Sequence, residues 1–328
     1  MTGKKRILSG MRPTGPLHLG NLHGALMNWV QMQEEYDCFY FIADWHALTS
    51  DYENTSMLAE YTKEMIIDWL SAGLSPDKST MFIQSHIKEH AELFLILTMI
   101  TPVPWLERNP TYKDQIVQLS NKDLSTFGFL GYPVLQAADI IMYKPFGVPV
   151  GIDQVPHVEI TREIARRFNY LYGQIFPEPE AILTKTPKIL GFDRRKMSKS
   201  YNNAIFLSDT PDIISSKVSL MITDPQRARK KDPGDPEVCN VFEFHKIYTD
   251  SSIAADINAK CRIAEIGCVE CKKIMAQNLS VALEPIREKR KYYKANPKIV
   301  DNIIADGNIK ARKVAADTME EVRNLLNI

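Results

Sequence analysis

The sequence has 328 residues, 45% of them hydrophobic and 24% charged, a globular composition that excludes disordered and low-complexity classes. Forty lysines and arginines balance forty aspartates and glutamates, so no global field draws the chain toward nucleic acid or an anionic membrane. The longest apolar run, Leu93 to Ile100, is far shorter than the roughly 20 residues of a membrane span, and no apolar signal region opens the sequence. We therefore expect a cytoplasmic protein of two domains without a membrane partner, in which any polyanion site is a local patch.

Short apolar segments and longer amphipathic segments alternate over the first two thirds of the chain, as is typical of a parallel sheet covered by helices. Apolar runs predict strands at Lys5 to Ser9, Cys38 to Ala43 and Met81 to Gln84. Apolar residues at helical spacing predict helices at His23 to Glu35, Ser56 to Ala72, Tyr132 to Tyr143 and His157 to Tyr172, with Pro145 to Gly151 as a connection. We expect an α/β fold with a Rossmann-like, doubly wound parallel sheet.

The pattern changes after the Ser- and Asn-rich stretch around Ser198 to Asn203. From Ile213 to the end, helical periodicity dominates and no further strand is expected. We therefore predict a boundary near residue 205, with an α/β domain at residues 1–205 and an all-α domain at residues 206–328. The C-terminal helix is a candidate to pack back onto the first domain.

A turn rich in glycine and proline, PTGPLHLGN, separates the first expected strand from the first expected helix. Backbone N–H groups and a helix N-terminus meet at such a turn and favour anion binding. The turn carries Thr14, Gly15, His18, Gly20 and Asn21. Taken alone, it is as compatible with a purely geometric role as with phosphate binding.

A second motif, Lys196 to Ser200 (KMSKS), lies in a polar loop where two ammonium groups and two hydroxyls can converge on phosphates. Taken alone, it is equally compatible with a solvated basic loop. The two motifs together are much more specific. HLGN after the first strand and KMSKS ahead of a helical domain resemble the two signatures of class I aminoacyl-tRNA synthetases.

The resemblance narrows to tryptophanyl-tRNA synthetases of the bacterial type and extends over essentially the whole chain. It is carried by LSGMRPTGPLHLGN, FIADWHALT, YPVLQAADIIMYKP, VGIDQVPHVEITREIARRFN, KMSKS and TDPQRARKKDPGDPEVCNVF. The tyrosyl enzymes are close relatives, and AADIIMY is the segment that discriminates against them. A paralogue that only binds tryptophan or RNA is a further alternative, which two intact phosphate motifs disfavour.

This resemblance implies an ATP-dependent tryptophan–tRNA ligase. Such an enzyme activates L-tryptophan with ATP to tryptophanyl adenylate and pyrophosphate, and then transfers tryptophan to the 3′ end of tRNA(Trp). The α/β domain would be catalytic and the helical domain would bind the anticodon. Relatives of this type are homodimers that associate through the catalytic domain, so we expect a homodimer.

Recognition of tryptophan requires one buried acceptor in an apolar, aromatic-sized slot, because an indole has one N–H donor and no acceptor. Asp139 fits this role, since its alanine and isoleucine neighbours argue against the alternatives of an N-cap or a surface charge. By resemblance, Asp139 reads the indole, and His46 lies near the polar end of the substrate. Tyr132, Gln136 and Gln154 lie nearby by the same resemblance, although some relatives have methionine where this chain has Gln136.

The same resemblance assigns the ATP site. His18 and Asn21 hold the phosphates and adenosine, while the two KMSKS lysines follow the charge that develops on the β and γ phosphates, with Mg²⁺ bridging them. Lys113 is a further candidate cation, and an exposed helix lysine is the equal alternative. The expected catalytic residues are His18, Asn21, Lys113, Lys196 and Lys199. The expected ATP-binding residues are Met11, Arg12, Thr14, Gly20, Asn21, Gly151, Asp153, Lys196, Met197, Ser198, Lys199 and Ser200.

Four of the five cysteines gather in the predicted helical domain, whereas Cys38 lies in an expected strand as a small core residue. Cys239, Cys261, Cys268 and Cys271 have the spacing C-x21-C-x6-C-x2-C. Four thiolates suit either tetrahedral zinc or a [4Fe-4S] cluster. Zinc sites usually show two C-x2-C pairs, and only one is present. The spacing resembles the iron–sulfur signature of a subset of the family, with a first interval one residue shorter, so we expect a cluster, with zinc or unligated core cysteines as alternatives.

Contacts with RNA have no direct signature in the sequence. Candidate positive residues are Arg227, Arg229, Lys230, Lys231 and the run Arg287 to Lys294, in which Tyr292 and Tyr293 are candidates to stack on unpaired bases. Solvated helix faces are the alternative for each of these charges.

Overall fold

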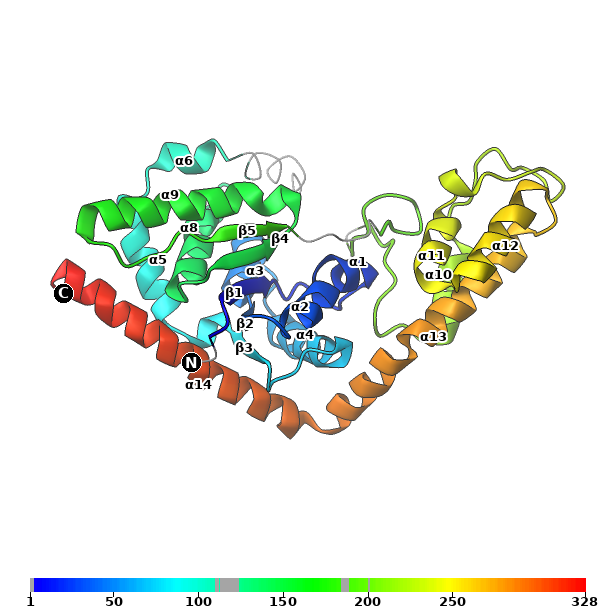
Figure 1. The fold of residues 1–328 in the computed structure, drawn as a ribbon. Coiled ribbons are helices and arrows are strands. Elements are labelled where there is room, and N and C mark those ends of the chain that lie inside the picture. Colours follow the sequence, from blue (N-terminus) through cyan, green and yellow to red (C-terminus); the bar gives the residue numbers. More distant parts are fainter. Residues whose placement is uncertain (1–2, 110–111, 113–123, 184–188, 200) are drawn as a thin grey trace.

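The computed structural model describes residues 3–109, 112, 124–183, 189–199 and 201–328. Within these ranges, five parallel strands form one sheet in the order β3-β2-β1-β4-β5 (Figure 1). The strands are Arg6–Met11 (β1), Asp37–Ile42 (β2), Ser79–Ile83 (β3), Gly147–Val150 (β4) and Glu180–Leu183 (β5).

Helices cover both faces of the sheet, and further helices follow it in the chain. Those of the sheet-bearing part are α1 (Leu19–Asn21), the π-helical turn η1 (Leu22–Leu26), α2 (Met27–Met32), α3 (Asp44–Asp51), α4 (Leu58–Ala72), η2 (Gln84–His86), α5 (Glu89–Ile100), α6 (Val103–Glu107), α8 (Phe127–Met142), η3 (Ile152–Gln154) and α9 (Val155–Tyr172). The others are α10 (Pro211–Ser219), η4 (Pro236–Val238), α11 (Asn240–Tyr248), α12 (Ser251–Arg262), α13 (Cys268–Ala295) and α14 (Pro297–Leu326). Of the helices that the structure describes, none combines the length and apolarity required to cross a bilayer.

Alternate residues of the central strands enter two separate cores, one on each face of the sheet. In β2, Cys38, Tyr40 and Ile42 pack in a core that also contains apolar residues of α2 and α4. Phe39 and Phe41 enter the opposite core, which α5, α8, α9 and α14 complete. Burial of both faces explains the uninterrupted apolar sequence of this strand.

The expected α/β fold, with a Rossmann-like parallel sheet and a second, helical part, is confirmed. The three expected strands are present as β1, β2 and β3, with ends shifted by one or two residues. The expectation that Pro145 to Gly151 is only a connection is wrong, because Gly147–Val150 forms β4 between β1 and β5. Proline is rare in central strands, and it is tolerated here because the described β1–β4 ladder pairs Ile7 with Gly147 and stops before Pro149. The boundary at residue 205 stays a prediction.

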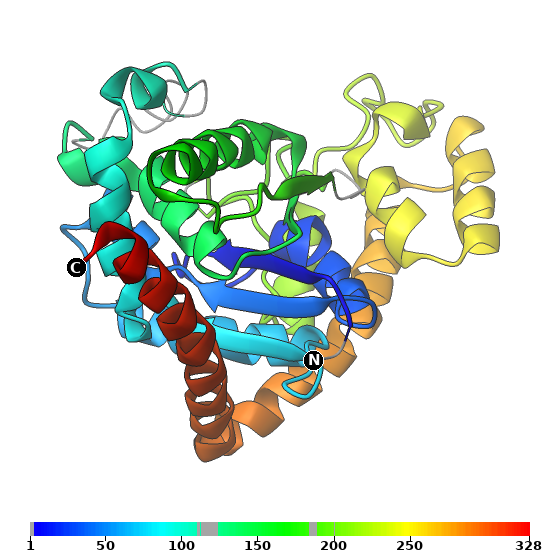
Figure 2. The same cartoon turned by 60° about the vertical axis from the view of Figure 1, so that its left-hand side comes forward.

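The helix α14 lies along the edge strand β3 and continues past α5 and α8 (Figure 2). It approaches so closely at Gly307 that a Cβ atom there would overlap the carbonyl oxygen of Met81. Oδ1 of Asn308 accepts a hydrogen bond of 3.1 Å from the backbone N–H of Ile83. Edge strands expose unpaired backbone groups, and α14 covers those of β3.

A buried group of charges joins α4 to α13. Arg290 is 5% exposed, pairs with Asp68 through Nη1, and donates from Nη2 to Oε2 of Glu64 at 2.6 Å. Asp68 is 1% exposed, and its Oδ2 accepts the backbone N–H of Leu17 at 3.2 Å. Asp68 therefore ties α4, α13 and the turn after β1 together.

Replacing Arg290 with methionine keeps most of the buried volume but leaves Asp68 without its charged partner. We expect Arg290→Met to lower the free energy of unfolding by about 3–5 kcal/mol, as for other broken buried pairs, measured by urea denaturation. The control is Lys291→Met, because the Lys291 side chain is 72% exposed and should matter little. Equal stability of the two variants would contradict this assignment.

Candidate functional site

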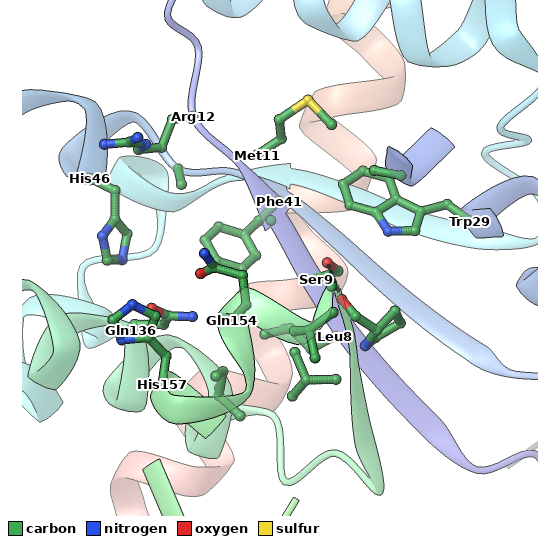
Figure 3. A pocket seen from close by; sticks show the side chains of 18 of the residues that line it. Leu8, Ser9, Met11, Arg12, Trp29, Phe41, His46, Gln136, Gln154 and His157 are labelled. Carbon is green, nitrogen blue, oxygen red and sulfur yellow. Dashed lines mark hydrogen bonds between the residues drawn. The ribbon is translucent and has the colours of Figure 1, made fainter. Parts of the chain in front are cut away.

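A cavity of about 480 Å³ opens at the carboxyl ends of β1 and β4 (Figure 3). The strand order reverses between these two strands, because β2 and β3 lie on one side of β1 while β4 and β5 lie on the other. Such a switch point is where open parallel sheets bind their ligands, since the connections diverge to opposite faces and leave a crevice. Its walls combine strand ends, the turn η1, and the helices α2, α3, α8 and α9.

Many of the residues predicted for the site line this cavity. They are Met11, Arg12, Asn21, His46, Tyr132, Gln136, Gly151 and Gln154. Sequence reasoning missed Ser9, Trp29, Phe41 and His157, which line it as well. His157 lies three residues after Gln154 in the quoted segment VGIDQVPHVEI, and this spacing was the available signal. Trp29 and Phe41 gave none, because they read as ordinary core residues.

The two phosphate motifs meet beside the cavity although they are far apart in sequence. Nζ of Lys199 lies 3.5 Å from Oγ1 of Thr14, a separation of 185 residues along the chain. His18 forms a β-bridge with Phe206, just beyond KMSKS. Gly20 approaches Met197 so that an added Cβ would lie 3.7 Å from the methionine Cβ. The PTGPLHLGN turn and the KMSKS loop therefore lie next to each other in the folded chain.

Burial tunes the titratable groups of these motifs. It lowers the pKa of Lys199 to about 8, and the positive charge of Arg12 acts in the same direction. It also lowers the pKa of His18 to about 4, with Lys199 as the second cause, so the imidazole is neutral at pH 7. Among the described residues, Nδ1 of His18 has no hydrogen-bond partner despite its burial. An orphaned buried polar atom of this kind is a candidate ligand contact.

The short α1 that follows His18 continues into the π-helical turn η1. π-Helical turns often occur at functional sites. Asn21, at the end of α1, and Gly24, within η1, both line the cavity. A Cβ built on Gly24 meets no atom within 4 Å, so the glycine leaves open space at the cavity wall.

Asp139 is fully buried behind the cavity and is not one of its lining residues. Its carboxylate accepts hydrogen bonds from Nε2 of His46 at 2.8 Å, Nε2 of Gln84 at 2.8 Å and Nδ1 of His90 at 2.6 Å. His90 also bonds through Nε2 to Oη of Tyr143 at 2.8 Å. Burial alone would raise the pKa of Asp139, but the hydrogen bonds from the two histidines outweigh it and lower that pKa. Asp139 is therefore an ionised, buried acceptor, as its apolar neighbours in the sequence predicted.

A second buried chain of hydrogen bonds orients Tyr132. Nδ2 of Asn109 lies 3.1 Å from Nδ1 of His157, and Nε2 of His157 lies 2.9 Å from Oη of Tyr132. Burial lowers the pKa of His157 to about 4, so this imidazole is neutral at pH 7. With Nδ1 accepting from Asn109, the ring proton sits on Nε2 and is donated to Tyr132. The tyrosine hydroxyl is then free to donate its own proton toward the cavity.

The predicted ATP-site residues that do not line the cavity differ in their exposure. Asp153 is exposed and accepts from Nε2 of Gln154 at 3.1 Å. Lys196 is exposed, Met197 is buried, and the backbone N–H of Ser198 donates to Asn203 at 2.8 Å. Lys113 and Ser200 lie outside the described residues.

The four cysteines of the helical part lie at the ends of helices. Cys239 precedes α11, Cys261 lies in the last turn of α12, and Cys268 and Cys271 lie in the first turn of α13. Burial is the main cause that raises the pKa of Cys271 to about 12, and the other three thiols act in the same direction. The four thiols are therefore close enough to interact electrically. Within the described ranges, no group of three or more histidine, cysteine or acidic side chains has an arrangement that could hold a metal ion.

Two polar groups adjoin these thiols. Nη1 of Arg227 lies 3.6 Å from Sγ of Cys261, and Nε2 of His245 lies 3.4 Å from Sγ of Cys271. The guanidinium of Arg227 also donates to the backbone oxygens of Lys230 and Ile266, so it is engaged within the fold.

The other predicted RNA contacts divide by exposure. The expectation that the whole run Arg287 to Lys294 faces RNA is wrong, because Arg287 and Arg290 are buried and pair with acidic residues. Tyr292 is 54% exposed. Arg229, Lys230 and Lys231 are exposed.

Comparison with known proteins covers nearly the whole chain. Residues 1–284 match the model of a family described as "tRNA synthetases class I (W and Y)". The tryptophan–tRNA ligase of Thermotoga maritima is 54% identical, with 98% of this chain and 99% of that protein covered. The Aquifex aeolicus ligase is 48% identical, with 98% and 100% covered. The solved tryptophanyl-tRNA synthetase of Campylobacter jejuni, in complex with ADP and tryptophan, is 34% identical with a TM-score of 0.91, covering 98% of this chain and 100% of that one.

The family model and the relatives agree with the geometry. Two phosphate motifs flank a cavity at the switch point of a parallel sheet, and a buried carboxylate lies behind that cavity. The similar ligases match over essentially their full length as well as that of this chain. The chain therefore belongs to the class I aminoacyl-tRNA synthetases and, within them, to the bacterial-type tryptophanyl-tRNA synthetases, which are tryptophan–tRNA ligases.

Proposed function

We propose that the cavity at the carboxyl ends of β1 and β4 binds L-tryptophan and ATP side by side and forms tryptophanyl adenylate. The tryptophanyl group is then passed to the 3′ end of tRNA(Trp). The observation that carries this proposal is the meeting of Thr14 and Lys199, which brings both phosphate motifs together next to Arg12, a residue that lines the cavity. The Campylobacter jejuni relative holds ADP and tryptophan together, which supports two adjacent subsites here.

The ATP subsite acts by position and charge. Tryptophan's carboxylate attacks the α-phosphate while pyrophosphate leaves, so the protein must align the reactants and neutralise developing charge. Neutral His18 donates an N–H to the phosphates, and Asn21 adds an amide from the cavity wall. Lys196 and Lys199 supply the positive charge, and Mg²⁺ enters with the phosphates of ATP.

The tryptophan subsite lies toward α8. A carboxylate offers about four acceptor positions, and the described donors make four contacts with Asp139, two of which come from the same Nε2 atom of Gln84. We assign the indole N–H to Asp139 in place of one of these two Gln84 contacts, reached beside His46 at the cavity wall. Tyr132, Gln136 and Gln154 then surround the amino acid, with the hydroxyl of Tyr132 directed by His157.

Tryptophan-dependent ATP–pyrophosphate exchange tests this function. We expect exchange with tryptophan and not with tyrosine, and a fall in kcat/KM for tryptophan of about 100-fold in Asp139→Asn, since an amide both loses an acceptor and presents a donor to the indole. The matched control is Asp306→Asn, the same change at an exposed position of α14. Exchange with tyrosine would establish tyrosyl specificity, and absence of exchange with either would establish a binding paralogue. Unchanged kinetics in a folded Asp139→Asn would remove Asp139 from the site.

The cysteine group is proposed to hold a [4Fe-4S] cluster, with zinc as the alternative. Four thiols at the ends of three helices supply the donor type of either centre, although the described side chains are not arranged as a metal site and would have to turn toward one another. Ligation requires thiolates; burial raises the pKa of Cys261, and the neighbouring guanidinium of Arg227 acts against this rise. The ligands would be Cys239, Cys261, Cys268 and Cys271. The centre would fasten η4, α11, α12 and α13 to one another, since amino acid activation has no redox step.

Anaerobic purification followed by absorption spectra and assays of iron, sulfide and zinc tests the metal. We expect a broad band near 400 nm with about four irons and four sulfides per chain, and loss of both in Cys271→Ser. Cys38→Ala, which changes a core cysteine of β2, should keep them. The Cys271 variant should lose tRNA charging or stability more than adenylate formation. One zinc per chain would support the alternative, and no metal in any preparation would return these cysteines to the core.

We also propose a homodimer that associates through the sheet-bearing part. Large apolar side chains are exposed there on α5, α6 and α8: Leu95 (57%), Met99 (74%), Val103 (51%) and Phe127 (69%). Such a patch is unusual on a monomer and fits a self-complementary interface.

The exposed residues Arg229, Lys230 and Lys231, in the loop before η4, remain candidates for contact with tRNA(Trp). We place this activity in the cytoplasm.

Sedimentation equilibrium tests the dimer. We expect a mass about twice the 37.4 kDa of one chain, and dissociation in Met99→Asp because a charge would be buried without a partner. The control is Tyr170→Asp, at a side chain that is 88% exposed on α9. A wild-type mass of one chain, or equal behaviour of the two variants, would rule out this interface.

A further inference from the structure

The segment Leu17–His23, here called the signature segment, contains His18 and Asn21 and is held at its start by α4, which α13 braces, and at its end by α11. At its start, the backbone N–H of Leu17 donates to Asp68, whose carboxylate pairs with Arg290 of α13. At its end, the imidazole of His23 contacts Tyr248 of α11. The two proposed ATP contacts therefore lie between two anchors.

The contact between His23 and Tyr248 is specific in geometry. Nε2 of His23 lies 2.5 Å from Oη of Tyr248, and the two rings meet edge to face at 5.5 Å and 84°. His23 is 6% exposed, and burial lowers its pKa, so the imidazole is neutral and forms one directed hydrogen bond with the phenol. Tyr248 also packs against the core that contains Phe244, which fixes the position of its ring.

His23 is also close to the proposed ATP subsite in the chain. It lies in η1, between Asn21 and Gly24, and both neighbours line the cavity. A π-helical turn is a rare interruption of an α-helix that is found frequently at functional sites, and the imidazole of His23 ties this one to α11. Loss of the Tyr248 contact would therefore loosen the residues that face ATP before it loosens those that face tryptophan on α8.

The helix that carries Tyr248 begins at the cysteine group. Cys239 is the N-cap of α11, His245 lies beside Cys271, and Tyr248 ends the helix. Nine residues separate Cys239 from Tyr248, a distance of about 14 Å along the helix at 1.5 Å per residue. The contact of His245 with Cys271 lies one turn before Tyr248.

We propose that His23 and Tyr248 are positioning residues, through which α11 holds the signature segment in the geometry that binds ATP. The proposal rests on the proposed ATP subsite. Neither residue touches substrate; each acts through Asn21 and its neighbours. The hydrogen bond raises the fraction of molecules whose signature segment has the geometry that binds ATP. Because the apparent Kd for ATP is inversely proportional to this fraction, loss of the bond raises the apparent Kd.

Tyr248→Phe removes the hydroxyl and keeps the ring, so it tests the bond itself. In pyrophosphate exchange we expect the KM for ATP to rise three- to tenfold, the range given by the net worth of one buried hydrogen bond, with the KM for tryptophan within about twofold of wild type. The control is Tyr170→Phe, the same change at an exposed position of α9, which should alter neither constant. A purely structural role would move both constants together or lower only the melting temperature.

The pair is tested by a double-mutant cycle with His23→Phe. If the two residues act through one bond, the double variant is no worse in ATP KM than the poorer single variant. Additive effects, or an unchanged ATP KM in a Tyr248→Phe enzyme that melts like wild type, would overturn the proposal. A wild-type protein without tryptophan-dependent exchange would instead overturn the proposed function, so the two failures are distinct.

Discussion

All five described strands are parallel, so their carboxyl ends lie at one edge of the sheet, and the rest of the site depends on this constraint. The reversal of strand order between β1 and β4 opens a crevice at that edge. Ser9 and Met11 reach it from β1, and Gly151 and Gln154 reach it from the connection after β4. A sheet with antiparallel neighbours would send half of these connections to the opposite edge. The aromatic slot and the phosphate motifs would then have no common opening.

The fold was predictable wherever one strand carried its own signal. The continuous apolar run of β2 indicated that both of its faces are buried, and β1 and β3 have similar short apolar runs. Strand β4 could not be predicted because Gly147 and Pro149 are residues that usually terminate strands, and they join the sheet through long-range pairing, Gly147 with both β1 and β5 and Pro149 with β5. Strand β5 could not be predicted because it lies at an edge of the sheet and is only partly buried, so its sequence shows little apolar pattern.

The sequence allowed many residues of the site to be identified, but it did not show which of them contact one another. Asp139 could be identified as a buried acceptor from its apolar neighbours. Its donors Gln84 and His90 could not, because they lie on η2 and α5 and become neighbours only when the sheet assembles. In the same way, the acidic side chains of α4 pair with Arg290 and turn an expected RNA contact into an internal one. Pairing between distant elements leaves no local pattern in a sequence.

The length of α13 has a mechanical consequence. The helix carries Cys271 near its start and Arg290 near its end, a span of about 28 Å at 1.5 Å per residue. As a lever, it would convert a tilt of about 5° at the cysteine end into a movement of about 2–3 Å at Arg290. Pro285 lies between these points and cannot donate to the carbonyl of Val281, so the lever has a built-in point of low bending stiffness. The stiffness of the α13 turn around Pro285 would thus set how much of a tilt at Cys271 reaches Arg290.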